Sequence, residues 1–221
     1  MTAHRPHEHH LAVRRTARVH SLGDLEGAQE LWIVLHGYGQ LAADFIAPFA
    51  AIAGTSRAIV APEALNRFYR DRESKGGHAG RPVGATWMTR EDREVEIADY
   101  VAYLDAVADC WGAGRPLTVL GFSQGVSTLL RWVAHGHTTA ARVVAWAGEL
   151  PPDVDLVAHR ARFPAHGLDL VMGSVDEYHS WINLDGVKRR LDEASLPYRL
   201  HVFDGGHRLD RRTLLALAGG G

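Results

Sequence analysis

The sequence predicts an α/β domain with a mainly parallel central sheet and helices on both of its faces. Short apolar segments alternate along the chain with longer segments in which apolar residues recur at helical spacing. Several short segments are apolar on both sides, as in the Trp-Ile-Val-Leu run of residues 32–35. A strand has this pattern when helices cover both faces of a parallel sheet. The strand–helix alternation therefore indicates a parallel α/β sheet.

The expected elements follow one another in regular order. Strands are expected at 31–35, 58–61, 117–121, 143–147, 168–172 and 200–203. Apolar stripes at helical spacing run over 41–52, 97–111, 126–133, 184–194 and 214–218. Residues 16–21 and those near Leu11 are expected to form an antiparallel edge hairpin, and Thr89 with Asp92 predicts a capping box before the second helix. Residues 63–86 are charged and glycine-bearing, which is typical of a functional or mobile loop.

Length and composition fit one domain with a full core. The chain has 221 residues, of which 46% are hydrophobic, and we expect the domain over residues 11–221 after a flexible histidine-rich tail, residues 1–10. A net charge of −2 supplies no bulk attraction to nucleic acid or to an anionic membrane. No apolar run approaches the roughly 20 residues of a membrane span, and the tail has no apolar secretory core, so we expect a cytoplasmic protein. The single cysteine, Cys110, excludes an intrachain disulfide and a cysteine-based zinc site.

The strongest chemical signal is Gly121-Phe122-Ser123-Gln124-Gly125, which joins an expected strand to an expected helix. A G-x-S-x-G pattern in this context is typical of a nucleophilic serine on a tight, strained turn. The two glycines leave room for the close approach of strand and helix. The backbone N–H of Gln124 then points toward the developing oxyanion at the helix N-terminus. The alternative is that Ser123 is only a helix N-cap, a position that serine also favours.

A second glycine-rich turn, His36-Gly37-Tyr38-Gly39, follows the expected strand over 31–35. Stabilising an oxyanion takes a second donor from a different strand end, and a glycine-rich turn lets a backbone N–H face the substrate. The N–H of Tyr38 is the candidate donor. The alternative is an ordinary glycine turn between a strand and a helix.

Chain order supplies candidates for an acid and a base, because a triad on this architecture runs Ser, acid, His. Asp176 stands just after the expected strand over 168–172, and His207 follows a glycine pair after the last expected strand. Asp204 competes for the acid role, but it stands three residues from His207, which makes orienting the ring hard. The alternatives are a loop carboxylate or N-cap for Asp176 and a surface loop histidine for His207.

On these residues the chain resembles the phospholipase/carboxylesterase family of α/β hydrolases, the lidless serine esterases that include the acyl-protein thioesterases. The resemblance extends from Leu31 to His207 and rests on both glycine-rich motifs, on Pro62-Glu63-Ala64, and on the acid and base above. It implies an α/β-hydrolase fold without a large lid domain. It also implies a triad of Ser123, Asp176 and His207, with the oxyanion hole formed by the N–H groups of Tyr38 and Gln124.

The chain departs from the thioesterase pattern at four places. Val126 stands where another small residue is usual, and His179 stands where a valine often faces the pocket. The loop that ends at His207 is one residue shorter than usual, and residues 67–84 are unlike those of a typical thioesterase. These departures point to a bacterial carboxylesterase-like branch.

The expected activity is hydrolysis of carboxylic ester bonds, or of thioester bonds, through an acyl-enzyme, without a cofactor or a metal. The alternatives are an acyl-protein thioesterase, a lysophospholipase, and a non-catalytic α/β-hydrolase-fold binding protein. Four residues are expected to line an acyl pocket, with packing under a long loop as the alternative: Phe68, Trp87, Met88 and Trp181. Three arginines are candidates to meet an anionic leaving group, with a solvated loop face as the alternative: Arg67, Arg70 and Arg72.

We therefore expect a small ester or thioester as the partner, and we expect neither a nucleic-acid partner nor a membrane span. A homodimer is possible from the sequence. Metal binding by the tail histidines is the competing interpretation of residues 1–10: His4, His7, His9 and His10. A mobile terminal cluster lacks the outer hydrogen bonds that orient the ligands of a metal site. We therefore expect the tail to be dispensable for activity.

Overall fold

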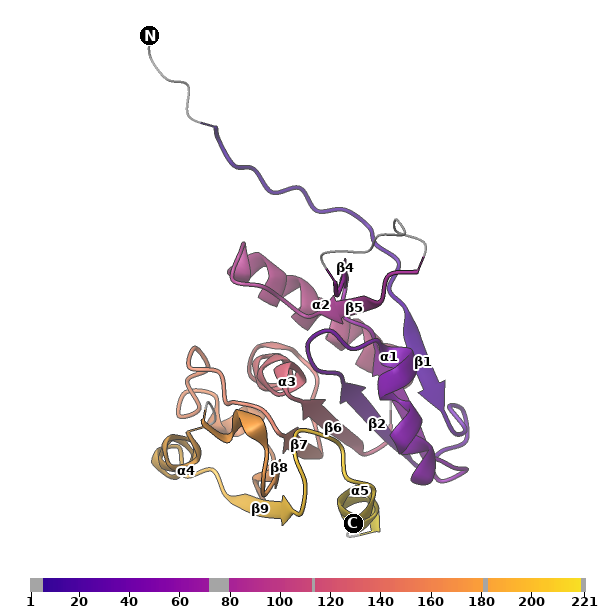
Figure 1. Ribbon diagram of the computed structural model, residues 1–221, viewed down its shortest axis with the longest axis vertical. Coiled ribbons are helices and arrows are strands. Elements are labelled where there is room, and N and C mark those ends of the chain that lie inside the picture. Colours follow the sequence, from indigo (N-terminus) through magenta and orange to yellow (C-terminus); the bar gives the residue numbers. More distant parts are fainter. Residues whose placement is uncertain (1–5, 72–79, 113, 181–182, 220–221) are drawn as a thin grey trace.

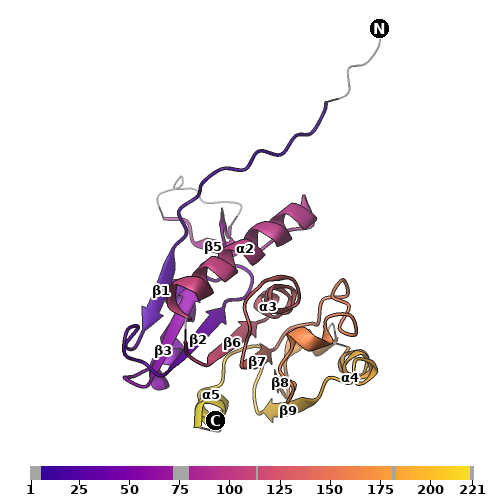
Figure 2. The ribbon, with the colours of Figure 1, turned by 180° about the vertical axis from the view of Figure 1, so that it is seen from behind.

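The computed structural model describes residues 6–71, 80–112, 114–180 and 183–219. The main sheet has seven strands in the order β1-β3-β2-β6-β7-β8-β9 (Figures 1 and 2). They are β1 (Val19–Leu22), β2 (Glu30–Leu35), β3 (Arg57–Pro62), β6 (Leu117–Phe122), β7 (Arg142–Trp146), β8 (Leu168–Gly173) and β9 (Tyr198–Phe203). Only β1 runs antiparallel to its neighbour, and the other pairs in this sheet are parallel. The predicted mainly parallel sheet is confirmed.

Helices cover both faces of this sheet (Figure 1). One face packs against α2 (Arg93–Trp111), α3 (Gln124–His135) and α4 (Leu184–Glu193), and the other packs against α1 (Ala42–Phe45) and α5 (Arg211–Gly219). Short 3₁₀ turns lie at η1 (Ala47–Ala51), η2 (Arg160–Arg162) and η3 (Glu177–Ser180). Within the described ranges, no helix has both the length and the apolar character to cross a membrane.

Strand β2 shows how the apolar pattern produces these two layers. Leu31, Ile33 and Leu35 belong to the hydrophobic cluster under α2 and α3, whereas Trp32 and Val34 belong to the cluster under α1 and α5. Successive strand side chains point to opposite faces, so a strand between two helical layers is apolar at every position. This alternation explains the continuous apolar run that predicted the strand.

Three expectations about local structure need correction. The predicted edge hairpin is wrong, because β1 pairs with β3 and residues 11–18 form no strand. The predicted capping box is also wrong, because α2 begins at Arg93, after Asp92, and not near Thr89. The stretch 63–86 is not only loop: β4 (Asn66–Tyr69) and β5 (Val83–Thr86) form an antiparallel hairpin within it.

The sheet brings the carboxyl ends of its parallel strands to one edge. Strands β2, β6, β8 and β9 end just before the segments that carry His36, Ser123, Asp176 and His207. Ligand sites in open α/β sheets lie beyond these strand ends. The six predicted strands are all present, so the fold places these four residues along one edge as the sequence predicts.

Candidate active site

Ser123 occupies the sharp turn between β6 and α3. Its backbone has φ 54° and ψ −117°, a conformation that a residue with a side chain adopts only at an energetic cost. The Ser123 N–H donates to Trp146 O at 2.9 Å, which fixes this turn against the neighbouring strand β7. The Ser123 side chain makes no helix-capping hydrogen bond. Ser123 thus stands at the N-cap position of α3 without capping it through its side chain, and its strained strand-to-helix turn matches the context in which the G-x-S-x-G pattern presents a serine.

Gly121 and Gly125 allow β6, α3 and the neighbouring strand β2 to approach one another closely. A Cβ on Gly121 would lie 2.3 Å from Gly125 O, and a Cβ on Gly125 would lie 2.3 Å from Leu35 O. Real side chains do not fit at such distances. The glycines at both positions are thus required by packing, which is the reason that the pattern predicted.

Asp176 and His207 form a close pair beside this turn. His207 Nδ1 lies 2.9 Å from Asp176 Oδ2, and Asp176 Oδ1 accepts a hydrogen bond from Tyr178 N. The Asp176 side chain is fully buried, and the imidazole is packed between the Phe122 and Tyr178 rings, with centroid distances of 4.9 and 4.5 Å. Phe122 directly precedes Ser123, so this contact places the imidazole next to the nucleophile turn.

The competing acid, Asp204, has a different partner. Its Oδ1 accepts from Ser174 Oγ at 3.4 Å, and within the described residues no contact joins its carboxylate to His207. Asp176 is thus the carboxylate that holds the ring, in line with the preference for it in the sequence. A carboxylate at Nδ1 leaves Nε2 free to exchange a proton with a nucleophile.

His36 is a buried, neutral histidine whose tautomer is set by its neighbours. Nε2 accepts from Ala64 N at 3.1 Å, so Nδ1 must carry the proton, which it donates to Gly37 O at 2.8 Å. Burial lowers the pKa of His36, and it outweighs the Gly37 O bond and the nearby Glu63 carboxylate, both of which favour the charged ring. The ring therefore stays neutral and locks the start of the turn.

The His36 bond also orients the peptide group that carries the Tyr38 N–H. Gly37 O and Tyr38 N belong to one trans peptide, in which the C=O and N–H point in opposite directions. Gly37 O accepts from the His36 ring and from Gln40 N, while Gln40 Oε1 accepts from Gly37 N. The Tyr38 N–H consequently points away from these bonds, and within the described residues no protein acceptor takes it.

Residues 84–88 hold both turns in place. Gly39 N donates to Ala85 O at 2.9 Å, and Trp87 Nε1 donates to His36 O at 2.8 Å. On the other side, the Gln124 side chain donates to Thr86 Oγ1 and Met88 O. Its Oε1 accepts from Trp87 N. Strand β5 and the two residues after it therefore connect the turn after β2 to the first residue of α3.

Sequence reasoning missed this connection. It assigned no role to Thr86 or Gln40. The Thr86 hydroxyl accepts a hydrogen bond from the Gln124 side chain, and the Gln40 side-chain oxygen accepts one from Gly37 N. The available signal was weak: Val83-Gly84-Ala85-Thr86 has β-branched residues at both ends, but it lies in a charged, glycine-bearing stretch.

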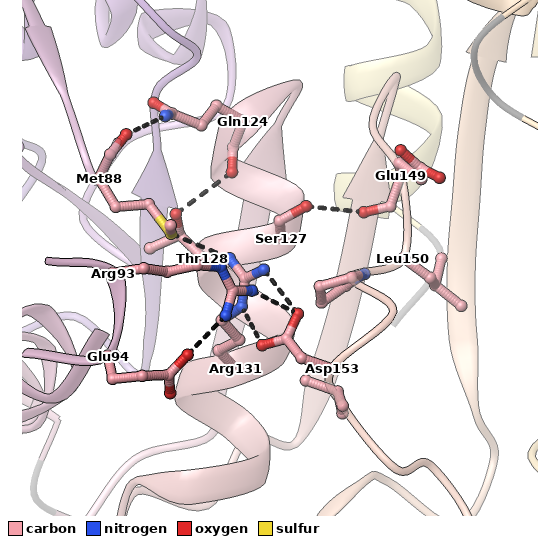
Figure 3. Close-up of polar contacts among 12 residues, drawn as sticks. Met88, Arg93, Glu94, Gln124, Ser127, Thr128, Arg131, Glu149, Leu150 and Asp153 are labelled. Carbon is pink, nitrogen blue, oxygen red and sulfur yellow. Dashed lines mark hydrogen bonds and ion pairs between the residues drawn. The ribbon is translucent and has the colours of Figure 1, made fainter. Parts of the chain in front are cut away.

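Two of the predicted acyl-pocket residues are structural. Trp87 is 2% exposed, and its ring packs at 5.1 Å on the His36 ring, so a substrate has no access to it. The Met88 side chain runs toward Arg131 of α3, with Sδ 3.4 Å from Arg131 Nη1, while its carbonyl bonds Gln124 (Figure 3). These two predictions are corrected to packing, the alternative that the sequence left open.

The other two predicted pocket residues differ from each other. Phe68 lies beside the turn after β2, with its ring 5.1 Å from the ring of Tyr38, whose side chain is exposed. Trp181 lies outside the described residues. Phe68 and Tyr38 together give this side of the site an aromatic surface.

An ion-pair network braces α3 below the nucleophile turn (Figure 3). Asp153 bonds both Arg131 Nε and Arg131 Nη2 at 2.8 Å, and it also pairs with Arg93 of α2. The hydrogen bonds from Arg131 hold the pKa of Asp153 far below its usual value, and the positive charges of Arg131 and Arg93 lower it further. This network ties α2, the C-terminal half of α3 and the segment after β7 together.

Glu63, from the Pro62-Glu63-Ala64 motif, is a fully buried carboxylate. Arg18 and Arg67 both pair with it, at 2.7 and 2.6 Å, and Ala42 N donates to it. Burial alone would raise its pKa, but the bonds from Arg67, Arg18 and Ala42 N hold the pKa of Glu63 below its usual value. Arg67 is therefore engaged in the fold, and Arg72 lies outside the described residues, so Arg70 is the one arginine of the predicted three that lines a groove of the site.

Among the described tail residues, 6–10, His10 makes a polar contact with the body. His10 Nε2 lies 3.0 Å from a carboxylate oxygen of Asp92, and Glu8, His10 and Asp92 offer three possible metal ligands within 4.8 Å of one another. All three are exposed. Among the described residues, no buried polar groups surround them to orient such ligands.

No protein-family model and no curated protein matches the sequence. Solved structures do match. Esterase PE8 is 23% identical with a TM-score of 0.68, over 92% of this chain and 97% of the other. Acyl-protein thioesterase 2 of Zea mays is 18% identical with a TM-score of 0.67, over 92% and 100%. A phospholipase/carboxylesterase from Dyadobacter fermentans is 16% identical with a TM-score of 0.65, over 95% and 98%.

These similarities extend over nearly the whole of both chains, but the sequence identities are low. They therefore bear on architecture, and they bear out at that level the resemblance to the phospholipase/carboxylesterase family. Together with the strand order and the covered parallel sheet, they show that this chain has the α/β-hydrolase fold.

Proposed function

We propose that this chain is a serine hydrolase that cleaves carboxylic ester bonds through an acyl-enzyme. The observation that carries the proposal is the pairing of buried Asp176 with His207 Nδ1, at 2.9 Å, beside a serine held at positive φ. The rings of Phe122 and His207 are in contact, and Phe122 is the residue before Ser123. A nucleophile, a base and an orienting acid at one strand edge are the parts that acyl transfer needs.

In the proposed reaction, His207 Nε2 takes the proton of Ser123 Oγ while this oxygen attacks the acyl carbonyl carbon. The tetrahedral intermediate collapses, and His207 gives the proton to the departing alcohol oxygen. Water then repeats the cycle on the acyl-enzyme and releases the carboxylic acid. Asp176 holds the imidazole in the tautomer with a proton on Nδ1 and stabilises the imidazolium that forms.

The oxyanion of each intermediate would be held by the N–H groups of Tyr38 and Gln124. The Tyr38 N–H is oriented by the hydrogen bond from the His36 ring to Gly37 O, which belongs to the same peptide group. The Gln124 N–H belongs to the first residue of α3, where helix N–H groups have no partner within the helix. Phe68 and Tyr38 would form the aromatic rim of the site. No metal or organic cofactor enters this reaction.

Thioester hydrolysis is the second candidate activity. The similarity to the maize acyl-protein thioesterase supports it, and the same residues would serve a thiol leaving group. A lysophospholipase and a non-catalytic binding protein are the remaining alternatives, and the latter requires an inactive triad.

The test is hydrolysis of p-nitrophenyl esters from acetate to palmitate, with matched thioesters, by the wild type and by Ser123→Ala. We expect turnover that disappears in Ser123→Ala and persists in Ser127→Ala, a serine of the same helix that bonds Glu149 O instead. A fluorophosphonate probe should label the wild type and not Ser123→Ala. Absence of both turnover and labelling in the intact protein would favour the binding protein.

A further inference from the structure

We propose that the physiological substrate is an ester whose leaving group carries a negative charge, and that Arg70 binds this charge in a groove beside His207. This inference rests on the proposed ester hydrolysis and adds the chemical class of the substrate. The anionic group is a carboxylate or a phosphate on the released alcohol or thiol.

The groove runs between the turn after β2 and the segment that carries His207. Gly39 and Gln40 form part of one wall, His207 and Arg208 form part of the opposite wall, and Arg70 lies at its side. A Cβ placed on Gly39 would lie 3.9 Å from Arg70 Nε, so the guanidinium reaches the turn that carries the proposed oxyanion donor. The groove therefore lies beside the proposed base, and Phe122, the residue before Ser123, also lines it.

Arg70 differs from the arginines around it in having no side-chain partner among the described residues. Arg67 is paired with buried Glu63, and Arg81 is paired with Asp71, so neither of these carboxylates neutralises Arg70. Within the described residues, no hydrogen bond or ion pair engages the Arg70 guanidinium. An exposed cation that no described side chain neutralises, in a groove that His207 also lines, is a suitable partner for a carboxylate or phosphate.

The position of the base determines which part of the substrate enters the groove. His207 must give its proton to the leaving-group oxygen, so that oxygen has to lie within hydrogen-bond reach of the imidazole. His207 itself lines the groove. The released alcohol or thiol, and not the acyl chain, is thus the part that extends along the groove toward Arg70.

The charges of the groove favour an anion. Two guanidinium groups, those of Arg70 and Arg208, line it against one carboxylate, that of Asp44. Arg208 contacts Asp210 at 3.3 Å, and such an exposed pair is weak, so Arg208 can add to the attraction without being essential. The negative charge of Asp44 repels an anion in the groove, so its removal is a second, independent test of the proposal.

The experiment compares four esters that share a butyryl group and differ in the alcohol. The esters of glycolate and of 2-hydroxyethyl phosphate are anionic. The ester of glycolamide is neutral, and the ester of choline is cationic. All four form the same acyl-enzyme, so kcat/KM reports how the leaving group is accommodated. The glycolate and phosphate esters distinguish the two sources of negative charge.

In the wild type we expect both anionic esters to be preferred over glycolamide and choline. Arg70→Gln should lower the anionic-to-neutral ratio of kcat/KM about three- to five-fold, the size expected for one exposed charge contact. Asp44→Asn should raise this ratio. Arg189→Gln, an equivalent charge removal on exposed α4, should leave it unchanged. Added salt should reduce the wild-type preference and have little effect on Arg70→Gln.

The ratio separates this inference from the proposed function. If the glycolamide ester is hydrolysed but Arg70→Gln changes the anionic and neutral esters equally, the anion proposal is overturned and the esterase stands. A wild type that prefers the choline ester would also overturn it. If Ser123→Ala retains full turnover of the neutral ester, the proposed function fails instead. Because the Arg70 side chain is exposed and unbonded, the variant should keep the thermal stability of the wild type.

Discussion

The two halves of the candidate site are held in different ways. The oxyanion half, with the turn after β2 and the start of α3, is fixed by the buried His36 ring, the buried Trp87 indole and the half-buried Gln124 amide. The acid–base half consists of the Asp176–His207 pair, on loops that follow β8 and β9. Disturbing the first half should affect folding and activity together, whereas disturbing the second should affect activity alone.

Backbone contacts in the acid–base half support this distinction. Ser174 N donates to Phe203 O and Val175 N donates to Gly205 O, so the two loops are joined without help from the side chains of Asp176 and His207. The position of the loops therefore survives a change at Asp176. In the oxyanion half, by contrast, the side chains of His36, Trp87 and Gln124 supply connections in addition to those of the backbone.

The largest expected effect is that of Asp176→Asn in the acid–base half. We expect kcat to fall about 10³- to 10⁴-fold, because an amide favours the wrong imidazole tautomer and cannot stabilise the imidazolium. The unfolding midpoint should change little. Ester kinetics and urea denaturation measure both quantities. Asp204→Asn is the matched control, and a larger loss of kcat in that variant would reassign the acid.

The next effect is that of His36→Asn in the oxyanion half. Loss of the ring leaves Ala64 N without its acceptor and frees the peptide that carries the Tyr38 N–H. We expect kcat to fall about 10- to 100-fold, less than for a deleted oxyanion donor. The free energy of unfolding should fall by about 1 to 3 kcal/mol.

Paired kinetics and denaturation of His36→Asn and of exposed His166→Asn would check this. A drop in activity at unchanged stability would contradict the proposed difference between the two halves, since it would mean that His36 acts on catalysis without supporting the fold.

The pH dependence of stability gives a finer comparison. The pKa of His36 is lowered in the folded state, so the unfolded chain binds a proton there first as the pH falls. The stabilisation from neutral His36 is complete above its unfolded pKa of about 6.5 and is lost progressively below it. Urea denaturation at pH 7.5 and pH 5.5 should therefore show a smaller loss of stability in His36→Asn than in the wild type. Equal losses would show that His36 titrates normally.

The smallest effect is expected from deleting residues 1–10. Among the described tail residues, the ion pair with the body is the exposed one of His10 with Asp92, and exposed pairs contribute little. Ester kinetics and the thermal midpoint should match those of the full chain, with and without added Zn²⁺. A loss of turnover on deletion would give the tail a function.

Features that depend on a local sequence pattern could be predicted from the sequence. Features that depend on contacts between distant parts of the chain could not. Strand β2 was predictable because both of its faces are apolar, and Ser123 because its turn needs glycines at fixed spacing. Asp176 followed from chain order. The β4–β5 hairpin was not predictable, since its place depends on the Gly39–Ala85 bond across the fold.

Trp87 illustrates the same limit for side chains. An aromatic residue at a strand end can line a pocket or fill the core, and the local sequence does not distinguish the two cases. The structure decides between them through the single hydrogen bond from its indole to His36 O and the burial that goes with it.

The stacking of Trp87 on His36 has an optical consequence. A protonated imidazole accepts an electron from an excited indole and quenches its fluorescence, whereas a neutral imidazole does so much less. The indole and imidazole centroids are 5.1 Å apart, which is well within range of such transfer. In a variant that keeps Trp87 and replaces the other five of the six tryptophans, the emission intensity would record the protonation of His36 in real time. The turn that carries the Tyr38 N–H thus contains its own spectroscopic reporter.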